Sequence, residues 1–123
     1  MTTTQFLDLY ENVEGKWELI DGVPVMMSGG SIRHAWVGGN ILVALSDKLR
    51  GTGCVPLGSD GGLRLDEHNV RYPDVAIYCD RRDLDLDAMK AKTFKHPCVI
   101  FEVLSQADMI EAARHRTIMT SNR

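Results

Sequence analysis

The sequence predicts a single α/β domain in which strands and helices mix along the chain without strict alternation. Three observations favour this class: a hairpin signal near the N-terminus, one long helical pattern, and two short apolar runs typical of buried strands. With 123 residues, of which 44% are hydrophobic, the chain is long enough to bury a core of its own. We therefore expect one domain over residues 1–123.

The N-terminal part predicts a short helix followed by a β-hairpin. Apolar residues recur at helical spacing within residues 5–14. The segment Trp17–Met27 then reads as two strands around Asp21-Gly22, a dipeptide that favours a tight hairpin turn. Because proline has no backbone N–H to donate, Pro24 places the second arm at an edge of the sheet or at the start of its strand.

A longer helix is predicted from Ser31, whose side chain can cap it, to about Arg50. Trp36 lies among apolar neighbours, so we expect it in the core. Gly38 and Gly39 weaken the helix by roughly 1 kcal/mol each relative to alanine. Small residues at these positions would let another backbone approach closely.

The second half of the chain predicts further strands. Residues 54–57 and 63–65 read as short strands joined by the glycine-rich loop 58–62. The segment 80–97 is polar and charged, so we expect a solvated surface connection with one helical turn. Residues 98–104 are nearly all apolar, which is typical of a central strand covered on both faces.

Two apolar runs each carry one acid. Asp74 lies in Tyr72–Tyr78, and Glu102 lies in Val99–Ser105. A carboxylate is costly to desolvate, so in a buried strand it needs a partner, a proton or a metal ion. Two such acids on adjacent strands would form a site for a hard cation, which indicates metal-dependent hydrolysis.

A structural interpretation of the same acids also fits the pattern. Asp74 would then end a turn after Pro73, and Glu102 would form an ion pair with Arg71 or Lys95. Both interpretations stay open at the level of the sequence.

The charge balance limits the partners. The formal net charge is -3, so no overall positive field attracts nucleic acid or an anionic membrane. DNA contact would need a local basic patch, and Lys90, Lys92 and Lys95 form the best candidate.

The cysteines and the N-terminus predict a cytoplasmic location. The three cysteines are widely spaced without a CxxC pair, which argues against a disulfide framework and against a cysteine-rich zinc site. The chain shows neither a signal-peptide pattern nor an apolar segment long enough to span a membrane.

Four motifs, in this order along the chain, resemble those of a known family. They are Glu18–Gly22, His34, Tyr72–Val75 with its Pro-Asp, and Phe101–Ser105 with its Glu-Val-Leu-Ser. Together they resemble the bacterial Uma-type family of the PD-(D/E)XK nuclease superfamily. The resemblance implies a restriction-endonuclease-like fold, a mixed sheet flanked by helices.

By that resemblance, Asp74 and Glu102 would bind magnesium or manganese, and Glu18 would be a third acid close to the site. His34 matches a family position whose role is undefined. A histidine that hydrogen-bonds the backbone at the start of a helix explains it equally well.

The chain also departs from the family pattern. Family members continue with an acid and a lysine on a following helix, whereas this chain has no lysine after Lys95. The expected lysine falls near Arg116, which could face a phosphate but could not deprotonate water. Leu104 occupies the plain ExK position. We therefore expect a domain that is incomplete at its C-terminus, with an open sheet edge covered in a homodimer.

Three functions are consistent with these patterns. The leading hypothesis is a magnesium-dependent DNA endonuclease in which Asp74, Glu102 and Glu18 are catalytic. Its substrate phosphates would contact Lys90, Lys92, Lys95 and Arg116. The alternative is a catalytically degenerate, truncated nuclease-fold protein that acts only through self-association. A third option is a metal-free small-ligand module that uses the loop 58–62.

Overall fold

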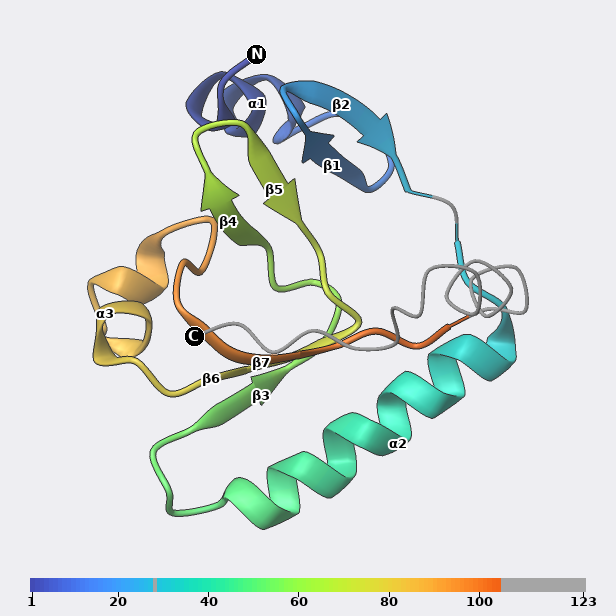
Figure 1. Ribbon diagram of the computed structural model, residues 1–123, viewed down its shortest axis with the longest axis vertical. Coiled ribbons are helices and arrows are strands. Elements are labelled where there is room, and N and C mark those ends of the chain that lie inside the picture. Colours follow the sequence, from blue (N-terminus) through green and yellow to red (C-terminus); the bar gives the residue numbers. More distant parts are fainter. Residues whose placement is uncertain (28, 105–123) are drawn as a thin grey trace.

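The computed structural model describes residues 1–27 and 29–104, and its strands form two antiparallel sheets (Figure 1). In chain order the elements are α1 (Thr3–Tyr10), β1 (Trp17–Ile20), β2 (Val23–Met26), α2 (Ile32–Leu49), β3 (Val55–Leu57), β4 (Leu63–Asp66), β5 (Asn69–Arg71), β6 (Val75–Tyr78), α3 (Arg81–Leu84), the 3-10 turn η1 (Ala88–Lys90) and β7 (Pro97–Phe101). The strand orders are β2-β1-β5-β4 and β3-β6-β7. An isolated parallel bridge joins Leu63 to Phe94. The predicted α/β class is confirmed.

The N-terminal hairpin is confirmed. β1 and β2 pair antiparallel, with Trp17 opposite Met26 and Ile20 opposite Val23. Asp21 and Gly22 have φ angles of 49° and 79°, the positive values that a tight two-residue turn requires. As Pro24 predicted, β2 lies at an edge of its sheet.

Helix α1 covers the first sheet. It begins earlier than the sequence predicted because Thr2 and Gln5 form a reciprocal capping box. Phe6 is 2% exposed and packs with the fully buried Leu19 and Val70, which lie on neighbouring strands. This cluster holds the helix and the sheet together.

Helix α2 runs alongside β3 (Figure 1). Ser31 caps it by accepting a hydrogen bond from the His34 backbone N at 3.1 Å, as the sequence predicted. None of its residues is fully buried, because only one of its faces meets the β3-β6-β7 sheet. Trp36 is 69% exposed, so its predicted core position is wrong. None of the described helices is long and apolar enough to cross a membrane.

The second sheet has β6 at its centre. All four residues of β6 are buried, and β6 pairs with β3 on one side and β7 on the other. Among the described residues, β7 pairs only with β6, and it is partly exposed along its length. Within residues 1–27 and 29–104, β7 is therefore an edge strand and not the central strand that was predicted at 98–104.

The charged connection contains one buried acid. It forms α3 and η1, so the single predicted helical turn is joined by a second one. Asp83 is 5% exposed and accepts hydrogen bonds from the backbone N atoms of Lys95 and His96, at 2.9 and 2.7 Å. The prediction of a wholly solvated segment is wrong for Asp83, which anchors the chain just before β7.

Cys54 and Cys79 form a disulfide, contrary to the sequence prediction. Val55 and Tyr78 pair between β3 and β6, so the residues just beyond them also face each other. The pairing depends on strand register, which cysteine spacing alone does not reveal. Cys98 is a free thiol.

The burial of Tyr78 makes the stability of the core beside β6 depend on pH. Its side chain stacks on Phe94 with ring centroids 4.3 Å apart, and among the described residues its hydroxyl finds no hydrogen-bond partner. Burial, with a smaller effect of the nearby Asp83 carboxylate, raises the pKa of Tyr78 to about 12.

Tyr78→Phe should therefore reduce the fall in the free energy of unfolding that the wild type shows at alkaline pH. Between about pH 10 and 12 the unfolded phenol ionises while the folded one keeps its proton, so the free energy of unfolding falls as pH rises, by about 2–3 kcal/mol across the window. Below that window the contribution is constant. Urea unfolding at neutral pH and at about pH 11 measures the difference.

The matched control is Tyr10→Phe, which leaves Tyr78 in place and should show the full decrease. At neutral pH, Tyr78→Phe should be as stable as the wild type or more stable, because it removes an unpaired buried hydroxyl. An unchanged alkaline decrease in Tyr78→Phe would contradict the assignment.

Candidate functional site

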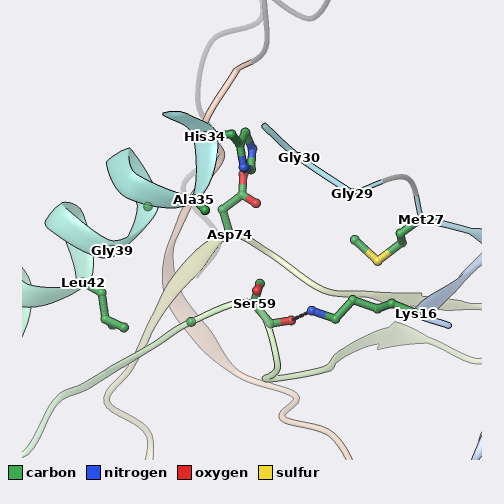
Figure 2. A pocket seen from close by; sticks show the side chains of 12 residues that line it. Lys16, Met27, Gly29, Gly30, His34, Ala35, Gly39, Leu42, Ser59 and Asp74 are labelled. Atoms are coloured by element: carbon green, nitrogen blue, oxygen red, sulfur yellow. Dashed lines mark hydrogen bonds and ion pairs between the residues drawn. The ribbon is translucent and has the colours of Figure 1, made fainter. Parts of the chain in front are cut away.

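Asp74 lies directly before β6 and makes two contacts through one oxygen. Its Oδ2 accepts a hydrogen bond from the Val103 backbone N at 2.7 Å and lies 3.3 Å from Nε2 of His34. Figure 2 shows the imidazole of His34 pointing at this carboxylate from the first turn of α2. The Asp74 side chain is 20% exposed, so it is shielded but reachable from solvent.

Glu102 follows β7 directly and is exposed. Val75 pairs with Phe101 in the antiparallel β6–β7 ladder. Continuing that register by one pair sets Asp74 opposite Glu102, and opposite residues of an antiparallel pair share a face. The bond from Val103 to Asp74 ties the two chain segments together just past this pair.

His34 is held in place by its surroundings. It lies in the first turn of α2, and its backbone N is bound by the Ser31 cap. A Cβ atom added at Gly30 would lie 2.7 Å from the His34 Nδ1, too close for a real contact. Gly30 thus leaves the space that the imidazole needs to reach Asp74.

Glu18 contacts the chain segment that precedes Asp74. It lies on β1, and its Oε2 accepts a hydrogen bond from the Tyr72 backbone N at 2.8 Å. This bond fixes the start of the Tyr72-Pro73-Asp74 connection. Burial, and then the charges of Glu18 and Asp60, raise the pKa of Tyr72, which keeps its phenol protonated.

A cavity of about 410 Å³ opens beside Asp74. Its polar lining includes Lys16, His34, Ser59 and Asp74, and glycines make up much of its remaining wall (Figure 2). Glycines leave backbone atoms accessible to a ligand, since no side chain covers them. The carboxylate of Asp74 and the ammonium group of Lys16 therefore line the same open cavity.

Lys16 is the cation of this cavity, and sequence reasoning missed it. Its Nζ donates to the Ser59 carbonyl oxygen at 2.6 Å and lies 3.3 Å from the Asp60 carboxylate. It also lies 5.4 Å from the ring centroid of Tyr72. A single lysine before a hairpin carries no sequence signal that would link it to Asp74.

The lysines proposed for phosphate contact lie elsewhere. Lys92 pairs with Glu11 at 3.1 Å, and Lys90 lies 3.6 Å from Asp87. Lys95 lines a separate hollow. The structure does not bring these lysines into the Asp74 cavity, and Arg116 lies outside the described residues.

The donor set suits a hard cation with few protein ligands. Among residues 1–27 and 29–104, no group of three or more His, Cys, Asp or Glu side chains gathers to hold a metal ion. Asp74 and Glu102 would offer two carboxylates, and Mg²⁺ is commonly bound by one or two carboxylates while it keeps several waters. The residues present thus fit such an ion.

Comparison with known proteins identifies the family. The Uma2 family, described as "Putative restriction endonuclease", matches residues 3–117. The chain belongs to the Uma2 family. The resemblance seen in the motifs of this Uma2 chain is thereby confirmed.

A solved structure supports the same fold. The crystal structure of a "putative nuclease belonging to DUF820" from Anabaena variabilis superimposes on the Uma2 chain with a TM-score of 0.69 at 15% sequence identity. The match covers 94% of this chain and 66% of that one, so this chain spans about two thirds of its structural neighbour. It confirms the restriction-endonuclease-like fold class. A search of the curated proteins found no match.

Proposed function

We propose that this Uma2 chain is a magnesium-dependent DNA endonuclease that hydrolyses phosphodiester bonds. The observation that supports the proposal is the register of β6 and β7. One step beyond the Val75–Phe101 pair, Asp74 would lie opposite Glu102, and Asp74 lines an open cavity whose lining does not include Glu102. The family and the fold of the structural neighbour support it. Asp74 and Glu102 are the proposed ligands of the ion, with Mn²⁺ as a substitute for Mg²⁺.

The bound ion would activate a water and offset charge on the phosphate, chemistry that no side chain of this cavity supplies alone. Asp74 uses Oδ2 for its contacts with Val103 and His34, which would leave Oδ1 to hold the ion. Val103 and His34 fix the carboxylate in one orientation. Glu18 is the third proposed catalytic acid, and it positions the chain segment that leads into Asp74.

Lys16 is the residue that we propose for contact with the cleaved phosphate. It is the lysine that lines the Asp74 cavity, and the Ser59 carbonyl holds its ammonium group at the cavity wall. A fixed cation stabilises negative charge that develops on a phosphate. Its role would compensate in part for Leu104 at the position where the superfamily carries a lysine. Phosphates farther along the DNA are proposed to contact Lys90, Lys92, Lys95 and Arg116.

The wider setting is proposed on the sequence arguments given above. Residues 1–123 would act as one domain, in the cytoplasm, and as a homodimer. The cytoplasmic location requires Cys54 and Cys79 to be reduced there, because a reducing compartment keeps thiols unpaired.

The test of the proposed function is nicking of supercoiled plasmid by the purified chain. We expect nicking in Mg²⁺ or Mn²⁺ and none in excess EDTA, because both proposed ligands need the ion to act. Glu102→Gln should lose most of this activity, since it removes one of two carboxylates.

Binding of Mn²⁺, measured by NMR together with nicking, separates the proposal from its alternative. Mn²⁺ should broaden the NMR signals of residues near Asp74 and Glu102 in an active enzyme. A chain that neither binds Mn²⁺ there nor nicks plasmid would be the catalytically degenerate, self-associating protein instead.

A further inference from the structure

The outer face of α2 is an unusually apolar surface for an exposed helix. Large apolar side chains on it are Ile32, Trp36, Val37 and Val43, of which Trp36 and Val43 are 69% and 70% exposed. Large apolar side chains that are exposed together on one face often mark a site of contact with another protein surface. We therefore expect this face to contact another protein surface.

The exposed residues of this face follow a coiled-coil pattern. Arg33, Trp36, Asn40, Val43 and Asp47 follow at alternating steps of three and four residues, and Val37 and Ala44 lie beside them. Residues at this spacing form one stripe along a helix, which can pack lengthwise against a second helix. We define these seven residues as the α2 stripe.

We propose that the α2 stripe binds the α2 stripe of a second copy of this chain, antiparallel, around a two-fold axis that passes beside Asn40. A two-fold interface must be self-complementary, because one patch meets its own copy. The α2 stripe meets this condition in shape and in charge.

The shapes match across the proposed axis. With Asn40 opposite its own copy, Trp36 lies opposite Ala44, so the largest side chain meets the smallest. Val37 lies opposite Val43, which puts two apolar side chains of equal size together. Each pair occurs twice by symmetry, and the two Asn40 amides can hydrogen-bond to each other.

The charges match as well. Arg33 lies opposite Asp47 at both ends of the α2 stripe. Among the described residues, none forms an ion pair with Arg33. Asp47 lies 3.6 Å from Arg50, and both of those side chains are about four-fifths exposed, so that contact is weak. Both charged groups are thus available to a partner.

The pairing leaves the candidate site open. His34 is half-buried against Asp74, whereas the α2 stripe lies on the exposed side of the helix. The inference therefore holds whether or not the chain cleaves DNA, and its test does not use nuclease activity.

The test is sedimentation equilibrium of the full chain over a range of concentrations. The wild type should be a dimer. Arg33→Asp and Asp47→Arg should each raise the dissociation constant about tenfold or more, because each places like charges together at two symmetric positions. The double variant should return to within a few-fold of the wild type, since the reversed pair attracts again.

Two variants, each of which replaces an exposed apolar residue by aspartate, test the centre of the interface. Val43→Asp should raise the dissociation constant strongly, whereas Leu86→Asp, at a residue that is 80% exposed outside α2, should leave it unchanged. Circular dichroism confirms that these surface variants fold. A wild type that is monomeric at every concentration would overturn the proposal, including the case in which residues 105–123 cover the α2 stripe. A dimer insensitive to these variants, or a double variant that is not rescued, would overturn it too.

Discussion

Asp74→Asn should reduce Mg²⁺-dependent plasmid nicking by about 100-fold or more. Loss of a group that merely orients a metal ligand already weakens binding or activity by about 10- to 100-fold, so loss of a ligand's charge should exceed that. Asparagine has the same shape as aspartate, and its amide oxygen can still accept the hydrogen bond from Val103. The variant therefore keeps the bond to Val103 and removes the charge, including the charge that faces His34.

The measurement is the initial rate of nicking at saturating Mg²⁺, together with Mn²⁺ line broadening. Asp8→Asn, which changes an exposed carboxylate on α1, should match the wild type in both. Nicking by Asp74→Asn at the wild-type rate would contradict the assigned ligand. A large fall in its melting temperature would instead indicate that Asp74 is structural, as the alternative interpretation of the sequence holds.

Asp83→Ala should lower the free energy of unfolding by about 2–4 kcal/mol. The substitution leaves the backbone N–H groups of Lys95 and His96 without the carboxylate that binds them, and an unsatisfied buried donor costs about 1–3 kcal/mol. Because Asp83 is 5% exposed, water replaces the lost bonds poorly. Urea denaturation monitored by circular dichroism measures the change.

Asp85→Ala is the matched control, since it removes an exposed carboxylate from the same segment. Its effect should stay within about 0.5 kcal/mol. Equal stability of the two variants would show that the bonds to the chain before β7 do not contribute to folding. Because those bonds precede the strand that leads to Glu102, Asp83→Ala should also weaken any nicking.

Local chemistry made part of the fold predictable. Asp21-Gly22 fixes a hairpin turn, and Ser31 fixes a helix start, because each acts through its immediate neighbours. Trp36 and β7 were placed wrongly because their burial depends on how many elements cover them. Apolar character alone does not supply that number.

The candidate site was predictable only where a motif marks it. Asp74 and Glu102 follow from apolar runs and the family pattern, although their roles stay predictions. Lys16 and Asp74 line the same cavity although they are far apart in the sequence, and residue spacing does not predict such a meeting. The contact between His34 and Asp74 likewise depends on the absence of a Cβ atom at Gly30.

The pairing of Leu19 with Val70 has a consequence for the order of folding. The hairpins β1–β2 and β4–β5 need only short loops and can form within microseconds. Joining β1 to β5 closes a much longer loop that contains α2 and β3, and its entropy must be lost before the contact is gained. We therefore expect this closure to be the slow step, and a chain still being synthesised cannot complete it before Val70 emerges.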